Sequence, residues 1–268
     1  MSKQPTSATE SVAWPVAILS DVHGNAEAFE AVLENIRNRG IPLTLNIGDV
    51  IGYGPDPERC IDLAMAHCDV TLCGNHEYAV LHGAHGFNPV AQHAVEFVRE
   101  RLEPKADNRD EDVLRRWAFL HTLGATYGYD SFVMMHGSPR HPVMEYILPS
   151  DPELDPLKVD DIFDCMPCDL VFVGHTHFPG VVEEGGSFFL TAELLQGRYI
   201  LQPGLKAIVN VGSVGQPRDR DFRSCYVEFD GQSVWFRRVP YDVEATIRKI
   251  ENHGVLHESL GARLREGR

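Results

Sequence analysis

Side chains of the types that bind metal ions follow several short apolar segments of the chain. Each apolar segment predicts a buried strand, and the polar residues come at the point where that strand ends. Histidine, carboxylate and amide groups are ligands that first-row transition metals accept in proteins. The candidate ligands, in chain order, are Asp21, His23, Asp49, Asn75, His136, His175 and His177. One such residue would mean little, but their repetition at strand ends predicts a shared metal site.

The expected sheet explains how these residues could meet. In an open α/β sheet, ligands bind in the crevice beyond the carboxyl ends of the strands. Asp21 and His23 alternate along an extended segment, which places both side chains on the same side. We therefore expect residues from five loops, far apart in sequence, to converge on one point.

Two metal ions suit this set better than one. Seven protein ligands are too many for one tetrahedral ion, whereas the two oxygens of Asp49 could bridge two ions about 3.5–4 Å apart. Asp21 and Asp49 would balance two of the four positive charges, so the remaining charge could bind phosphate while a hydroxide attacks phosphorus in line. Ligands without cysteine are compatible with Mn, Fe, Co, Ni or Zn. We expect two divalent ions, with manganese first and Mg as a further candidate.

His76 is set apart from the ligand set. It follows Asn75 directly, so we expect its ring to face the same cleft without being needed as a ligand. A histidine there could protonate the leaving oxygen or stabilise charge in the transition state, which contributes roughly 10²–10⁴-fold to the rate. The alternative is that His76 only orients the ligands.

The elements that must position these residues can be predicted from the apolar pattern. Strands at 15–19, 43–47 and 69–72 are each followed by a polar turn that contains glycine, and the first two lead into helices at 26–39 and 57–66. Such β-α-β order predicts a parallel sheet buried on both faces. Residues 88–121 are expected to be helical around a charged connector, and residues 243–264 to form one or two helices. The remaining expected strands are 131–135, 170–173, 181–183, 188–191, 207–211, 224–229 and 234–239.

Composition excludes several classes of partner. The 268 residues carry 24 Lys and Arg against 39 Asp and Glu, a net charge of −15. This charge repels phosphate backbones and anionic lipids, so we expect neither long nucleic acids nor membranes as partners. No apolar run approaches the roughly 20 residues that span a bilayer. Six cysteines are too sparse for a disulfide framework, and we expect a reduced, cytoplasmic protein.

The organisation of the chain is expected to be simple. Residues 1–12 are rich in Ser, Thr and Gln and are expected to form a disordered tail. Residues 13–268 are expected to form a single domain with a helical tail from about residue 242. Cys165 and Cys168 have the spacing of a redox or zinc pair, but no second pair exists, so buried structural cysteines are expected. The oligomeric state is not indicated by the sequence.

The ordered blocks resemble a known pattern. The blocks are Asp21-Val-His23, Gly48-Asp49, Gly74-Asn-His-Glu77, His136 and Gly174-His-Thr-His177. Together they resemble the calcineurin-like metallophosphoesterase superfamily, over about residues 16–219. The segments 210–219 and 241–243 resemble its small bacterial and archaeal phosphoesterase branch.

This resemblance implies a fold and roles for individual residues. The fold would be α/β (α+β), a four-layer metallophosphoesterase β-sandwich of two mixed sheets flanked by helices. His76 would be the catalytic histidine, and Arg218 could reach the substrate phosphate, although a surface salt bridge would also explain that arginine. One ion would be held by Asp21, His23, Asp49 and His177, and the other by Asp49, Asn75, His136 and His175.

The chain departs from one branch of the superfamily at two residues, and this departure reduces the number of expected activities. Ser/Thr phosphatases of the eukaryotic type carry Asp and Arg where this chain has Gly52 and Tyr53, which argues against direct protein-phosphatase activity. We expect a metal-dependent hydrolase of phosphate mono- or diesters that acts on a small phosphorylated substrate. The loops 52–56, 82–88 and 140–149 are expected to set specificity. The alternatives are a dinucleoside polyphosphate hydrolase and a non-catalytic interaction scaffold, although a scaffold would not need His76 and the full ligand set.

Overall fold

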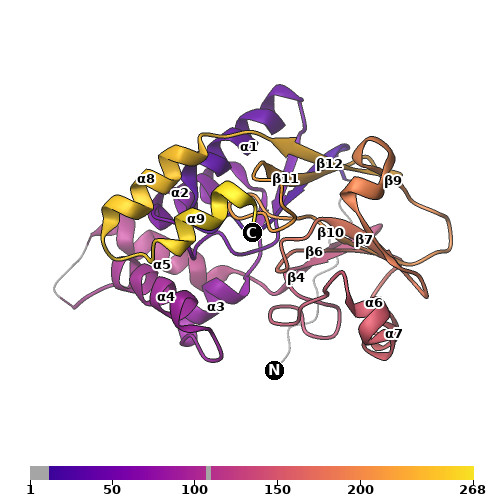
Figure 1. The fold of residues 1–268 in the computed structure, drawn as a ribbon, viewed down its shortest axis with the longest axis horizontal. Helices are drawn as coiled ribbons and strands as arrows, with labels where there is room; N and C mark the ends of the chain where they lie inside the picture. Colours follow the sequence, from indigo (N-terminus) through magenta and orange to yellow (C-terminus); the bar gives the residue numbers. More distant parts are fainter. Residues whose placement is uncertain (1–11, 107–109) are drawn as a thin grey trace.

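Two six-stranded β-sheets lie face to face at the centre of the computed structural model, which describes residues 12–106 and 110–268 (Figure 1). Helices cover the outer face of each sheet. The predicted disordered tail lies outside the described residues except for Val12, which packs partly buried against the core between the sheets. The described residues thus form the four layers that the resemblance implied.

The first sheet is mixed, with the strand order β3-β2-β1-β11-β12-β9. Its first three strands run parallel, as the β-α-β pattern predicted, and β11 pairs with β1 in the antiparallel direction. Its strands are β1 Val16–Leu19, β2 Leu43–Asn46, β3 Val70–Thr71, β9 Arg198–Ile200, β11 Ser224–Phe229 and β12 Ser233–Val239.

The second sheet is also mixed, with the order β4-β5-β6-β10-β7-β8. Strands β5, β6 and β10 are parallel, so their carboxyl ends lie at one edge. Its strands are β4 Thr126–Tyr129, β5 Phe132–Met135, β6 Leu170–Val173, β7 Gly180–Glu183, β8 Phe188–Leu190 and β10 Ala207–Asn210. The sequence did not predict β4 or β9, which lie on sheet edges, where β4 forms a hairpin with β5.

The helices divide unequally between the outer faces. Seven of the helices in the described residues contribute to the apolar core on the first sheet, whereas α7 packs against the second sheet with α6 beside it. Figure 1 shows the larger group on the left and the two short helices at the lower right. The helices are α1 Ala26–Asn38, α2 Pro57–His67, α3 Asn75–His82, α4 Pro89–Leu102, α5 Glu111–Thr122, α6 Asp151–Leu154, α7 Pro156–Asp164, α8 Val243–His253 and α9 Ser259–Glu266.

Strand β1 shows why the apolar runs are continuous rather than alternating. Val16 and Ile18 point into the core between the sheets, while Ala17 and Leu19 belong to the core under the helices. All four side chains are fully buried. Because side chains alternate along a strand, a sheet covered on both faces needs apolar residues at every position.

The structure also shows the state and the burial of the cysteines. The six cysteines are free thiols. The prediction that Cys165 and Cys168 are both buried is wrong: Cys165 is exposed and Cys168 is half-buried. Cys165 is the C-terminal cap of α7, outside the helix face that carries the buried residues.

Among the described residues, no helix is long and apolar enough to cross a bilayer.

Candidate metal centre

The seven predicted ligands lie together at the carboxyl ends of the strands. Each follows a strand of one of the two sheets, except Asn75, which begins α3 after β3. All seven are buried, with at most 6% of any residue exposed. The convergence of five loops that the sequence predicted is therefore present in the structure.

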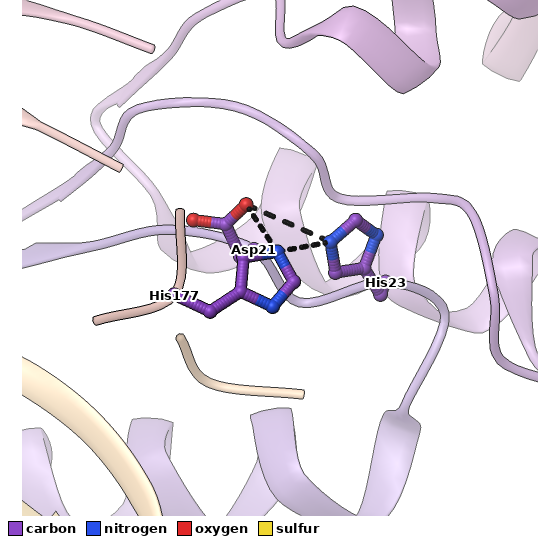
Figure 2. A group of neighbouring side chains, drawn as sticks. All are labelled: Asp21, His23 and His177. Carbon is purple, nitrogen blue, oxygen red and sulfur yellow. Dashed lines mark hydrogen bonds and ion pairs between the residues drawn. The ribbon is translucent and has the colours of Figure 1, made fainter. Parts of the chain in front are cut away.

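The first cluster of candidate ligand atoms comes from the loops after β1 and β6 (Figure 2). His177 Nε2 lies 3.1 Å from Asp21 Oδ1 and 3.0 Å from His23 Nε2. His23 Nε2 lies 3.6 Å from the same Asp21 oxygen. One carboxylate oxygen and two imidazole nitrogens therefore surround a single point.

The second cluster lies where the loops after β2, β5 and β6 meet the start of α3. His136 Nε2 lies 3.1 Å from His175 Nδ1, 3.0 Å from Asn75 Oδ1 and 3.3 Å from Asp49 Oδ2. This cluster therefore adds an amide oxygen to the carboxylate and the two imidazoles.

Asp49 lies between the clusters. Its Oδ2 is 3.7 Å from His23 Nε2 in the first cluster and 3.3 Å from His136 Nε2 in the second. Its Oδ1 accepts a hydrogen bond from the backbone N–H of His76 at 2.8 Å, which fixes the plane of the carboxylate. This is the position that a bridging carboxylate would require.

The four histidines share one hydrogen-bonding arrangement. One ring nitrogen of each faces a backbone carbonyl, and the other faces the cluster. Because a carbonyl only accepts, the nitrogen facing it carries the hydrogen, and the inward nitrogen of a neutral ring presents a lone pair. The ring–carbonyl pairs are His23 with Ile51 at 3.2 Å, His136 with Ile47 at 3.2 Å, His175 with Met144 at 3.2 Å and His177 with Gln216 at 2.6 Å.

Facing lone pairs repel each other unless a cation lies between them. In the first cluster, the inward nitrogens of His23 and His177 are only 3.0 Å apart. The Asp21 Oδ1 beside them is buried and has no hydrogen-bond donor in the described part of the chain. A buried acceptor without a donor is costly, and a metal ion would satisfy all three atoms. The residues present fit a metal ion on these grounds.

The pKa shifts of the ionisable groups in the site also favour a bound cation. Burial alone would raise the pKa of Asp21, but His177 and His23 hold it well below its usual range. Burial lowers the pKa of His175 to about 3 and that of His177 to about 4, so both rings are neutral at pH 7. Burial also opposes protonation of His136, but the charge of Asp49 raises the pKa of its ring to about 9. The site therefore attracts positive charge.

The backbone of the ligand loops is unusual. Five of the seven candidate ligands have positive φ, between 51° and 68°: Asp21, His23, Asp49, His175 and His177. Within residues 12–106 and 110–268, only two other non-glycine residues do so. Positive φ is costly for these residue types and persists where surrounding contacts impose it, often at functional sites. This feature is not visible in the sequence and supports the same residues independently.

Gly52 makes room for two rings of the site. A Cβ atom at this residue, which has a φ of +140°, would lie 2.6 Å from His23 Nδ1 and 2.7 Å from His76 Nδ1. The Asp found at the corresponding position in Ser/Thr phosphatases would therefore not fit here without movement of both histidines. The departure noted in the sequence is thus matched by the packing of this loop.

His76 lies beside the clusters, as predicted. Its ring is buried, and the ring centroid lies 4.7 Å from that of His23 and 4.6 Å from that of Tyr53. The Nδ1 atom of His76 has no hydrogen-bond partner among the described residues. Burial lowers the pKa of His76 to about 3, so the ring is neutral at pH 7. A ligand atom of His76 also lies within 4.8 Å of those of His23 and Asp49.

A cavity of about 210 Å³ opens next to Asn75 and His175. The three loops that were expected to set specificity all line it, through Tyr53, residues 85–88, and Met144 with Tyr146. The Tyr146 ring stacks on His175, with 3.7 Å between centroids and 14° between planes. The cavity gives a small molecule a place beside the candidate metal ligands.

Glu77 is a residue of the site that the sequence interpretation overlooked. Its buried carboxylate accepts hydrogen bonds from the backbone N–H groups of Asp49 at 2.8 Å, Ile51 at 3.1 Å and Gly74 at 2.8 Å. Glu77 thereby ties the Asp49 loop to the start of α3. The signal in the sequence was an acidic residue three positions after Gly74, where it caps a helix N-terminus.

Arg218 makes no surface salt bridge with any described residue, so the alternative explanation of this arginine is wrong. Its Nη2 donates to Gln216 Oε1 at 2.9 Å, and its Nε is buried without a partner in the described residues. The neighbouring Asp219 pairs with Arg238 instead. Arg218 is thus held next to the candidate ligand His177, whose carbonyl accepts from the Arg218 backbone N–H.

Fold and site together define a class: a four-layer α/β sandwich with buried histidine and aspartate clusters at the carboxyl ends of its strands. The chain belongs to the calcineurin-like phosphoesterase family, whose sequence model matches residues 15–179. The family is metal-dependent, which agrees with the ligand clusters. The resemblance and the fold predicted from the sequence are confirmed.

Similar proteins span almost the whole chain. The chain is 34% identical over 262 residues to the uncharacterized protein MJ0912 of Methanocaldococcus jannaschii, covering 94% of this chain and 98% of that protein. A crystal structure of a metallophosphoesterase from Sphaerobacter thermophilus is 31% identical with a TM-score of 0.77, covering 95% and 99%. The hypothetical protein PH1004 of Pyrococcus horikoshii shares the fold, with a TM-score of 0.71 at 18% identity and coverage of 95% and 98%.

Proposed function

We propose that this protein hydrolyses phosphate mono- or diesters of small molecules with two divalent metal ions. The observation that carries the proposal is the set of inward-facing histidine nitrogens and carboxylate oxygens around Asp49. One ion would be held by Asp21, His23, Asp49 and His177, and the other by Asp49, Asn75, His136 and His175. The donor set of oxygen and imidazole without cysteine is compatible with Mn, Fe, Co, Ni or Zn, and manganese is the first ion to test.

Two such ions supply positive charge that binds the phosphate and stabilises the charge developing on it. The protein's own contribution is to hold the four histidine ligands in place by bonding the outer nitrogen of each ring to a main-chain carbonyl. Arg218 lies next to His177, and its Nε, which has no partner in the described segments, could donate to a phosphate oxygen. A guanidinium is well suited to this because its donors match the geometry of phosphate oxygens.

We assign His76 the role of proton donor to the leaving group. In hydrolysis, a water oxygen bonds to phosphorus, the bond from phosphorus to the leaving oxygen breaks, and the leaving oxygen gains a proton. His76 is neutral in the free protein because its burial lowers the pKa of its ring. A phosphate anion beside the ring would favour the protonated form, since a nearby opposite charge stabilises it. The proton that His76 gives to the leaving oxygen would come from the attacking water, which releases a proton as its oxygen bonds to phosphorus.

The proposal is tested with protein stripped of metal and then loaded separately with Mn, Fe, Co, Ni, Zn or Mg. Each preparation is assayed with a phosphomonoester, a phosphodiester, a dinucleoside tetraphosphate and a phosphopeptide, and bound metal is counted by elemental analysis. We expect two ions per chain and hydrolysis of a mono- or diester. Activity confined to the dinucleoside tetraphosphate would favour the anhydride hydrolase, and no activity with any metal would favour a scaffold.

A further inference from the structure

Arg218 and Arg263 differ from most arginines of this protein. Most arginine side chains in the described residues form ion pairs with carboxylates. Neither Arg218 nor Arg263 has a carboxylate partner among the described residues, although both are half-buried. In a chain with a net charge of −15, two neighbouring arginines without acidic partners require a physical reason.

The two guanidinium groups lie on the same side of the site, near Tyr53. Burial lowers the pKa of Arg263, and the positive charge of Arg218 lowers it further. Burial raises the pKa of Tyr53, and both arginines oppose that rise. Two positive charges therefore lie near one phenol, and neither guanidinium forms an ion pair with a carboxylate of the described residues.

Arg263 reaches this position because of how the C-terminal helix packs. Helix α9 buries Leu260 and Leu264, and the close approach of Gly261 to Ile247 sets it against α8. In Figure 1, α9 lies beside α8 and ends near the middle of the molecule. The residue between the buried positions, Arg263, is thereby turned toward the site rather than out to solvent.

A second cavity lies next to Arg263, beside the cavity at the candidate metal centre. It has a volume of about 410 Å³ and is lined by Arg263, Tyr53, Asn88 and Ala91. The last three also line the cavity of about 210 Å³ at Asn75 and His175, so the two cavities share a wall. The other charged residues of the larger cavity, Glu266 and Arg268, pair with each other and leave Arg263 unbalanced.

We propose that Arg218, Arg263 and Tyr53 form a second anion subsite, which binds a second phosphate group of the substrate. This inference rests on the proposed function, in which the candidate metal centre holds the phosphate that is cleaved. The substrate class is then an ester that carries two phosphate groups close together, such as a bisphosphate. The Arg218 backbone is bonded to His177, and its guanidinium lies near Tyr53, so Arg218 would contact the substrate beside Tyr53.

The test compares two small probes that differ by one anionic group. Methylphosphonate and methylenediphosphonate are titrated by calorimetry into the manganese-loaded protein, and neither is cleaved as an ester. We expect the wild-type protein to prefer the diphosphonate, and Arg263→Met to reduce that preference about tenfold, the loss expected for one charge-assisted contact. Chelation of manganese by the diphosphonate is the same for both proteins and cancels in the comparison.

The matched control is Arg265→Met. Arg265 lies on the same helix but is exposed and paired with Glu244, so this variant should keep the wild-type preference. Circular dichroism checks that each variant folds. If Arg263→Met does not fold, Arg218→Met tests the same subsite from another segment. A wild-type protein that binds both probes equally, or a full preference in the variants of Arg263 and Arg218, would overturn the subsite.

Hydrolysis of p-nitrophenyl phosphate by the same preparations separates this inference from the function. Hydrolysis together with an unchanged preference in both Arg263→Met and Arg218→Met would remove the subsite and leave the phosphoesterase intact. A lost preference without hydrolysis under any metal would support the subsite and count against the proposed function.

Discussion

The candidate metal centre and the tail formed by α8 and α9 both border Tyr53, but they are built in opposite ways. Five of the seven candidate ligands of the metal centre are loop residues with positive φ, and all seven side chains are buried. The tail consists of two regular helices that bury an apolar stripe and expose their ion pairs.

Because the two regions are built differently, we expect them to respond differently to substitution. In the metal centre, a polar atom removed from one residue leaves another buried atom without a partner, which is costly. In the tail, a polar side chain removed from the surface is replaced by water, and the apolar stripe still holds the helix. We therefore expect large functional effects from single atoms in the first region and small, salt-dependent effects in the second.

The sharpest test of the metal centre is Asp49→Asn, which replaces one carboxylate oxygen between the two clusters and removes a negative charge. We expect both metal occupancy and activity to fall, with activity reduced more than about 100-fold, because changing even the partners of metal ligands costs 10–100-fold. Elemental analysis and initial rates measure the two quantities. Asp160→Asn, on the exposed face of α7, is the control and should match the wild type. An active Asp49→Asn variant with two bound ions would contradict the bridging role.

His76→Ala separates chemistry from metal binding. We expect turnover to fall at least tenfold while two ions stay bound, because His76 is assigned proton transfer and not ligation. Rates and metal content are measured on the same preparation, and His67→Ala, at the exposed end of α2, is the control. Unchanged turnover would remove the proton-donor role. Loss of an ion as well would make His76 a ligand, a role for which it lies close enough to His23 and Asp49.

The ligand loops could be predicted from the sequence because their position follows from local rules. Apolar runs such as 16–19 and 170–173 predict buried strands, and parallel strands bring their carboxyl ends to one edge. Polar residues directly after such strands must then lie close together. The two mixed sheets and the four layers came instead from the resemblance to a family. The strand order was not predicted, and the edge strand 126–129 was missed because it carries too little apolar pattern to be recognised.

The remainder of the site depends on contacts between distant segments. Glu77 bonds to the loop of Asp49, and nothing in the residues around Glu77 indicates which loop it would reach. Arg263 lies on an amphipathic helix near the end of the chain, where its side chain resembles the exposed arginines beside it in the sequence. Only the packing of α9 on α8 turns it toward Tyr53. Local pattern therefore predicts ligands that follow strands, but not groups that arrive from another layer.

Glu77→Gln tests whether the ligand loops are held by this buried carboxylate. The amide offers one oxygen where the carboxylate uses two oxygens for three N–H donors, so at least one donor loses its acceptor. We expect the free energy of unfolding to fall by about 1–3 kcal/mol, the cost of one unsatisfied buried group. Urea unfolding followed by circular dichroism measures this value, and metal affinity should weaken in parallel. Wild-type stability in the Glu77→Gln variant would show that the ligand loops keep their conformation without the Glu77 carboxylate.

The smallest effect on stability is expected from Lys249→Met, which removes two surface ion pairs between α8 and the segments of Glu27 and Asp56. Lys249 Nζ lies 2.6 Å from Asp56 Oδ2 and 2.5 Å from Glu27 Oε1, but its side chain is 43% exposed. Solvent screens such pairs, so we expect a loss of only about 0.5–1 kcal/mol in low salt. Partial burial would lower the pKa of Lys249, but the two carboxylates raise it above its ordinary value.

The raised pKa gives the direction of the pH dependence. A lysine whose pKa is higher in the folded state contributes its full stabilisation below its ordinary pKa, and loses it as the pH rises through the raised value. The difference between Lys249→Met and the wild type should therefore be constant between pH 7 and about pH 9. It should shrink in 1 M NaCl, where the screening length is about 3 Å. A difference as large as that of Glu77→Gln, and insensitive to salt, would mean that the tail is held by polar contacts, as the metal centre is, and the contrast between the two regions would fail.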